Sequence, residues 1–211
     1  MFPLGLVLMP GGVLPLHVFE PRYQALVHDC LAGEQEFGVV LIERGHEVGG
    51  GDQRCGVGVR ARIVQLAELG EGRLALVCVA TERIRVERWL PDDPYPVAEV
   101  SAWDDGPAEH PLEQGFLDAL TTRVRRLAAL SLELGDPADD PSQDLPDEPL
   151  LRSYALADLA PLGPVDRQML LESPDATARL ALLSTLLDEV EPGLHFRLGE
   201  GSSPSDSPPA W

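Results

Sequence analysis

Three side chains near the start of the chain are of the types that transfer protons in enzymes. His17, Glu20 and Arg22 lie close together in the sequence, and a histidine beside a carboxylate is a common acid–base pair. They span the junction between an apolar run and a helix that begins at Pro21, so their side chains need not converge, and no nucleophile accompanies them. We expect Glu20 and Arg22 instead to satisfy backbone groups or to form an ion pair that fixes the start of the helix.

The other residues with catalytic or ligating potential do not fall into recognised spacings. The five histidines form neither H-x-x-x-H nor H-E-x-x-H, and no serine lies in G-x-S-x-G. The three cysteines, Cys30, Cys55 and Cys78, form no C-x-x-C pair, which argues against a disulfide framework or a structural zinc site. The aspartates between residues 136 and 147 lack the glycine and the terminal glutamate of an EF-hand. The sequence predicts no catalytic residue, no metal site and no cofactor.

The composition excludes several reaction classes and partners. The chain contains no lysine, so it carries no P-loop, no Schiff-base lysine and no Ser–Lys dyad. The formal net charge of −19 repels phosphate backbones and anionic membrane surfaces, so neither nucleic acid nor a membrane is an expected partner. The N-terminal apolar run has no basic residue before Arg22, and no stretch is long and apolar enough to span a bilayer. We therefore expect a cytoplasmic protein.

The elements that must position these residues are strands in the first half of the chain. Residues 2–27 read as a short apolar strand, a Pro-Gly-Gly turn, a second apolar run and a helix. Apolar runs and alternating patterns predict further strands at 37–42, 57–63, 74–79, 83–87 and 95–103. Short strands joined by tight turns predict a small curved sheet or a barrel over residues 1–104. The glycine-rich segment 46–52 is expected to be a mobile hairpin tip, not a phosphate-binding loop.

The second half has a helical period. Apolar residues at 112, 116, 120, 124 and 127 fall on one helical face. Helical patterns return at 149–159, at 165–172, and from a cap at Ser173 to a stop at Pro192-Gly193. We therefore predict an α+β fold with three parts: a β subdomain (1–104), a helical subdomain (105–195) that contains an acidic flexible loop (135–149), and a disordered tail (196–211).

Three stretches of the sequence resemble the N-terminal substrate-binding domain of Lon proteases, in the order in which that family has them. Two of them are the hairpin 71–86 and the helical run 166–187. One departure is Ala80, where the family usually has glycine. The most specific stretch is the opening, with the family motif Pro10, Gly11, Pro15, Leu16, Phe19, Glu20, Arg22 and Tyr23.

The resemblance implies a PUA-like β-barrel or curved sheet followed by a helical bundle. It also implies a substrate-binding role, as this domain has in full-length Lon, where the ATPase and protease domains follow it; the missing lysine excludes both of those active centres from these residues. We therefore expect a stand-alone, non-catalytic module that binds unfolded or extended polypeptide segments and works with a separate protease or chaperone. Its acidic charge would favour basic clients.

A bound segment would lie along a sheet edge or in the groove between the two subdomains. Tyr23 and Phe19 are expected in the core or lining that groove, and Arg60, Arg62 and Arg83 are expected to be exposed there. One alternative, RNA binding, stays open. PUA-like folds include RNA-binding proteins, and the strand arginines, with Arg85, form a locally basic pattern. A hydrolase has no nucleophile–base pair to support it.

Overall fold

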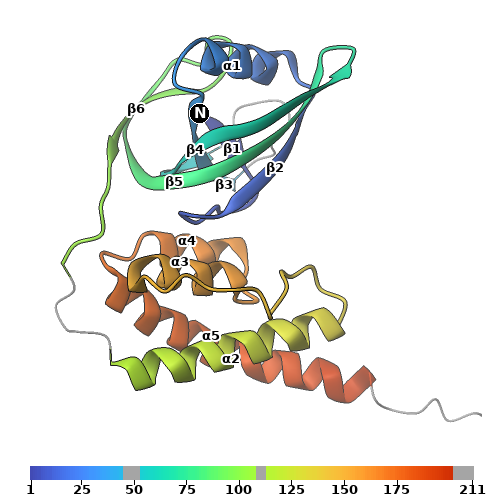
Figure 1. Cartoon of the computed structure of the whole chain (residues 1–211), viewed down its shortest axis with the longest axis vertical. Helices are drawn as coiled ribbons and strands as arrows, with labels where there is room; N and C mark the ends of the chain where they lie inside the picture. Colours follow the sequence, from blue (N-terminus) through green and yellow to red (C-terminus); the bar gives the residue numbers. More distant parts are fainter. Residues whose placement is uncertain (45–52, 108–112, 202–211) are drawn as a thin grey trace, which may run out of the picture.

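The structure, a computed structural model, describes residues 1–44, 53–107 and 113–201. The strands are β1 (Phe2–Leu4), β2 (Val13–Val18), β3 (Glu36–Arg44), β4 (Gln53–Gly70), β5 (Arg73–Leu90) and β6 (Val97–Ala102). The helices are α1 (Pro21–Ala32), α2 (Gln114–Glu133), α3 (Pro149–Leu159), α4 (Pro164–Leu171) and α5 (Ala176–Gly201). Figure 1 shows the strands and α1 in one half of the molecule and α2–α5 in the other. The predicted α+β architecture, strands first and helices second, is confirmed.

Some predictions fall on residues that the structure does not describe. The hairpin tip at 46–52, the apolar position 112 and residues 202–211 of the predicted tail lie outside the described residues.

The strands form one mixed sheet in the order β1-β3-β4-β5-β2, and β6 also pairs with β5. β1 runs parallel to β3, and the other paired strands are antiparallel. Along one edge β5 pairs with β4, and along its other edge it pairs first with β2 and then with β6. The outer edge of β2 pairs with no strand in the described part of the chain.

The sheet is curved but does not close into a barrel, because β1 and β2 at its two ends are not paired with each other (Figure 1). The segment that joins them buries Val7, Leu8 and Met9 in the core. The chain then turns at Gly11, whose φ is +86°. Of the two predicted forms, a barrel and a curved sheet, the open curved sheet is the one present.

β4 and β5 are much longer than the predicted strands, with 18 residues each. The two strands predicted at 74–79 and 83–87 are both parts of β5. No break separates them because Ala80 pairs with Ala61 inside the sheet, and a register shift next to Ala61 absorbs the irregularity. The turn between β4 and β5 is the predicted one, with positive φ at Gly70, Glu71 and Gly72.

The acidic loop 135–149 has no helix or strand before α3 begins at its end, but it is packed against the rest of the molecule. Leu145 packs against the core. The carbonyl of Gln143 accepts a hydrogen bond from Arg125, and that of Pro146 accepts one from Arg152. The loop that the sequence predicts as flexible thus contacts the rest of the molecule through one partly buried leucine and two hydrogen bonds.

α5 continues past Pro192, where the sequence predicts its end. A proline removes one helical N–H and crowds the preceding turn, but contacts with other elements hold the next turns in place. Leu194 is buried, and Arg197 pairs with Asp136 at 2.8 Å. Residues 196–201, predicted as part of the tail, are therefore helical.

The N-terminal cap of α5 also differs from the prediction. Asp175 accepts a hydrogen bond from the backbone N–H of Ala178 at 2.9 Å, while the hydroxyl of Ser173 donates to the carbonyl of Met169 in α4. The prediction of Ser173 as the cap was therefore wrong: aspartate and serine cap helices about equally well, and the path of the chain between α4 and α5 places Asp175, not Ser173, at the start of the helix.

Candidate functional site

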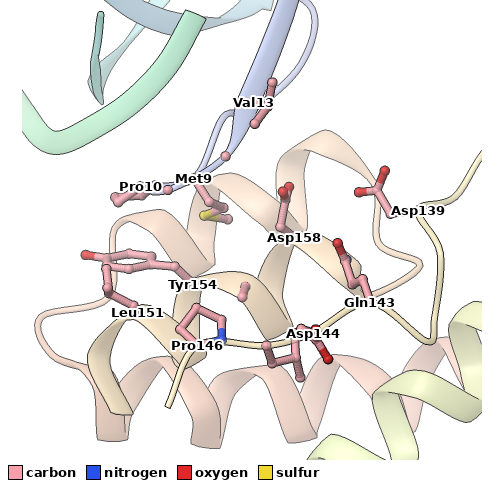
Figure 2. A pocket seen from close by; sticks show the side chains of 14 residues that line it. Met9, Pro10, Val13, Asp139, Gln143, Asp144, Pro146, Leu151, Tyr154 and Asp158 are labelled. Atoms are coloured by element: carbon pink, nitrogen blue, oxygen red, sulfur yellow. The ribbon is translucent and has the colours of Figure 1, made fainter. Parts of the chain in front are cut away.

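A cleft of about 330 Å³ lies between the turn that leads into β2 and the helical half of the molecule. Residues 9–13 form one wall, α3 forms another, and part of the acidic loop between residues 139 and 146 forms the third (Figure 2). This volume is at the lower end of the range for ligand pockets in proteins. The cleft is therefore large enough to hold a side chain of a partner.

The α3 wall is one face of that helix. Leu151, Tyr154, Ala155 and Asp158 line the cleft, and their spacing of three, four and seven residues places them on the same side. α3 begins where it does because Pro149 suits the first helical turn and the Glu148 side chain accepts hydrogen bonds from the N–H groups of residues 150 and 151. The helix can present a mixed face to the cleft because its other face buries leucines in the core.

The cleft is acidic. Figure 2 shows the carboxylates of Asp158 and Asp139 on the side of the helical subdomain that faces β2. Burial raises the pKa of Asp158, Arg167 at 3.0 Å opposes that change, and Asp139 adds to it. Asp139 and Asp144 have no cationic partner in the part of the chain that the structure describes. None of the described lining residues is an arginine.

The rim of the cleft is apolar on two opposite sides. Val13, at the start of β2, is 62% exposed, and Leu151, at the start of α3, is 44% exposed. Met9 and Pro10 continue the apolar wall below Val13. These exposed apolar side chains are available to pack against a molecule that enters the cleft.

The outer edge of β2 leads directly into this cleft, because Val13 belongs to both. Pro15 lies opposite Val77 of β5 and has no N–H, so its backbone nitrogen must be on the outer edge. In an antiparallel pair alternate residues direct their backbone groups to opposite edges. Val13 and His17 therefore offer N–H and C=O groups on the same outer edge as Pro15.

The structure brings part of the family motif to the cleft. Pro10 and Gly11 line its wall, and Pro15 and Leu16 lie further along β2. Phe19, just beyond the end of β2, is 59% exposed but does not line the cleft.

Glu20, Arg22 and Tyr23 secure the start of α1. Arg22 Nε lies 3.0 Å from a Glu20 carboxylate oxygen, which is the predicted ion pair, and the Glu20 side chain makes no capping hydrogen bond. Tyr23 is 4% exposed and stacks on Phe2 with ring centroids 4.1 Å apart. Of the two roles expected for Tyr23, only the core role agrees with its position.

The three strand arginines expected in the groove, Arg60, Arg62 and Arg83, do not form a basic surface. Arg60 pairs with Glu36 at 3.4 Å and with Glu82 at 3.0 Å, and Arg62 Nε donates to Glu36 at 2.8 Å. Arg83 was expected to be exposed, and this was wrong, because only 2% of its surface is exposed. Alternation along the strand correctly predicts that Arg83 shares a face with Arg85, but it does not show that the helical half covers part of that face.

Arg83 belongs to a buried polar network between the sheet and the helices. Its Nη1 donates to the carbonyls of Leu171 and Ser173, both at 2.7 Å, and its Nη2 lies 3.2 Å from Asp105. The same carboxylate accepts a hydrogen bond from Arg179 at 2.6 Å and one from the Tyr154 hydroxyl. Burial is the largest influence on Arg83 and Tyr154; it lowers the pKa of Arg83 and raises that of Tyr154.

The cleft residues on α3 were missed from the sequence, although a signal for them exists. The helix 149–159 was predicted, and Leu151, Ala155 and Asp158 share one of its faces. That face is neither fully apolar nor fully charged. The sequence pattern of such a face is the same as that of an ordinary solvent-exposed helix surface. Only its position opposite residues 9–13 makes it part of a site.

Metal binding and thiol catalysis have little support in the described part of the chain. It contains no group of three or more His, Cys, Asp or Glu residues that could hold a metal ion. Burial raises the pKa of all three thiols, that of Cys78 to about 11, which leaves them poor nucleophiles at neutral pH. Within the described ranges, no helix is long and apolar enough to cross a membrane.

The pattern of one known family matches nearly the whole chain. Residues 1–189 match the ATP-dependent protease La (LON) substrate-binding domain. Lon protease 2 of Myxococcus xanthus is 33% identical over 187 residues, which are 86% of this chain and 22% of that protein. Lon protease of Anaeromyxobacter dehalogenans is 32% identical, with the same coverage. The chain thus spans about a fifth of the length of these relatives.

Solved structures agree with the sequence comparison. The crystal structure of a Lon N-terminal domain protein from Xanthomonas campestris is 31% identical, with a TM-score of 0.65 over 87% of this chain and 95% of that one. The N-terminal domain of Mycobacterium avium complex Lon protease, at 23% identity and a TM-score of 0.53, shares the fold. Residues 1–189, with the open-edged sheet, the helical half and the cleft between them, therefore belong to the family of LON substrate-binding domains.

Proposed function

We propose that this chain is a non-catalytic module that binds extended or unfolded polypeptide segments along the outer edge of β2. The observation that carries the proposal is this open edge, which runs into a cleft with an apolar rim. A polypeptide in extended conformation can add to such an edge as a further strand. Backbone hydrogen bonds then supply affinity, and a pocket at the end of the strand supplies selectivity.

The wider setting is part of the same proposal. The bound segment would pass to a protease or chaperone activity that lies outside these 211 residues, which contain no lysine for a P-loop or a Ser–Lys dyad. A cytoplasmic location is supported by the three cysteines, all of which are unpaired thiols.

RNA binding is not favoured. It would use a basic strand face, but Arg60 and Arg62 are paired with glutamates and Arg83 is buried. Phosphate binding draws its affinity from cations that are available to displace counterions.

The test compares the binding of a chemically denatured client protein with that of the same protein in its folded form, by fluorescence anisotropy. We expect binding of the denatured client only. His17→Pro removes one outer-edge N–H and should weaken binding about fivefold, the effect of one hydrogen bond of about 1 kcal/mol. His17→Ala, which removes the side chain and keeps the N–H, is the matched control and should bind as the wild type does.

Two outcomes would count against the proposal. Equal binding of the folded and denatured client would show that extended segments are not selected. Equal affinities of the His17→Pro and His17→Ala variants, both with wild-type melting temperatures, would place binding away from the edge of β2.

A further inference from the structure

We infer that the cleft at the start of β2 selects bound segments in which a cationic side chain is flanked by apolar residues, the cation being placed among Asp139, Asp144 and Asp158. The inference rests on the proposed function, because it names the class of segment that this site would take.

The position of the cleft is the first argument. A strand added to the outer edge of β2 passes Val13, and Val13 forms part of the rim of the cleft. Successive side chains of a strand point to opposite faces. One side chain of the added strand at this point would therefore be directed towards the helical half of the molecule, where α3 lies opposite (Figure 2).

The charge of the cleft is the second argument. Three carboxylates line it and none of its described lining residues is cationic. Only Asp158 has a cationic partner, Arg167, which also donates to the carbonyls of Leu162 and Ala160 and is thereby held on the far side of Asp158. Asp139 and Asp144 have no such partner in the described residues. The negative charge in the cleft thus exceeds what the neighbouring cation neutralises, and a guanidinium or ammonium group complements it.

The apolar rim is the third argument, and it decides against a simple ion. Val13, at the start of β2, and Leu151, in α3, line the same cleft as the carboxylates and remain exposed. The methylene stem of an arginine or lysine side chain can pack against such walls while its charged end reaches the carboxylates. Apolar residues on either side of the cation would cover the rest of the rim.

The experiment uses two synthetic pentapeptides, Val-Leu-Arg-Leu-Val and Val-Leu-Gln-Leu-Val, each with blocked ends and a fluorescent label. The wild-type chain should bind the arginine peptide about fivefold more tightly than the glutamine peptide, the size expected for partly solvated ion pairs. The preference should shrink as salt is added, because exposed charges are screened.

Two double variants separate the cleft from the overall charge of the molecule. Asp139→Asn/Asp144→Asn removes two cleft carboxylates that make no hydrogen bond or ion pair with the residues described in the structure, and it should abolish the preference for arginine. Asp104→Asn/Glu189→Gln removes the same amount of charge away from the cleft and should keep the preference. Leu151→Ala should weaken the binding of both peptides by the same factor, since it alters the wall and leaves the carboxylates in place.

The outcomes distinguish the inference from the proposed function. If the denatured client and both peptides bind and arginine gives no advantage, the inference is overturned while polypeptide binding stands. If neither peptide nor the denatured client binds, the proposed function fails, and the inference fails with it. If both double variants lose the preference for the arginine peptide equally, the preference comes from the net charge of the molecule, and the inference about the cleft is overturned. A dimer that excludes both peptides would assign the cleft to a second copy of the chain, which also overturns the inference.

Discussion

Single side chains link parts of this molecule that are far apart in the sequence, and Tyr95 is an example. Its hydroxyl, just before β6, donates to Asp29 in α1 at 2.6 Å. The carboxylate acceptor favours the neutral phenol, and burial adds to the effect, so the pKa of Tyr95 rises from 10.0 to about 12. The residue thus fastens α1 to the sheet through an interaction that depends on pH.

The alkaline pH dependence of stability should report this contact. The pKa of Tyr95 in the folded state lies above its unfolded value, so the contribution is complete below pH 10.0 and is lost as the pH rises towards about 12. Asp29→Ala should return the pKa of Tyr95 towards the ordinary value, and His28→Ala, at the exposed neighbouring position, should leave it raised. Absorbance titration of tyrosinate, with Tyr95→Phe to assign the step, measures both. A wild-type Tyr95 that titrates at the ordinary value would contradict the contact.

At the scale of elements, two glycines have opposite roles. Gly11 turns the chain into β2 with φ of +86°, a conformation that other residues adopt at a cost. Gly193 lies inside α5, directly after Pro192, where its backbone freedom weakens the helix. Open space surrounds the Cβ position of both residues, so backbone conformation alone decides the effect of substitution.

Alanine substitutions at these two glycines should therefore shift stability in opposite directions. Gly11→Ala should lower the free energy of unfolding by about 1–2 kcal/mol, the cost of a left-handed conformation. Gly193→Ala should raise it by about 1 kcal/mol. Urea unfolding curves measure both values, and each variant serves as the control for the other. A destabilised Gly193→Ala variant would show that α5 ends at Pro192, as the sequence pattern predicts.

At the scale of the whole molecule, the sheet and the helices are joined by buried polar groups. Asp105 lies in the connection between β6 and α2 and contacts Arg83 of β5 and Arg179 of α5. Gln168 of α4 adds a hydrogen bond to the carbonyl of Val57 in β4. The Asp105 carboxylate is thus the counter-charge of two buried arginines, Arg83 in the sheet and Arg179 in the helical half. The two halves also supply the walls of the cleft, so the relative position of these walls depends on Asp105.

Asp105→Asn should destabilise the whole molecule and not one half alone. Removing the charged partner of a buried pair costs about 3–5 kcal/mol, and here two arginines lose their counter-charge together. Far-UV circular dichroism and tryptophan fluorescence should give coincident unfolding midpoints in the wild type, as for one cooperative unit, and lower midpoints in the variant. Asp104→Asn, at the exposed neighbouring position, should change neither. An unfolding midpoint of Asp105→Asn equal to that of the wild type would exclude the joining role.

The sequence by itself determined the order of elements, most of the helices and the family. These follow from local periodicity, from proline at helix starts and from three short stretches that resemble the family, all of which are patterns of neighbouring residues. The tertiary structure alone decided which side of each element is covered. It buried Arg83, placed Tyr23 in the core, carried α5 past Pro192 and set the mixed face of α3 opposite residues 9–13. Whether a residue is buried depends on which distant segment packs against it, and the local sequence around the residue does not determine that segment.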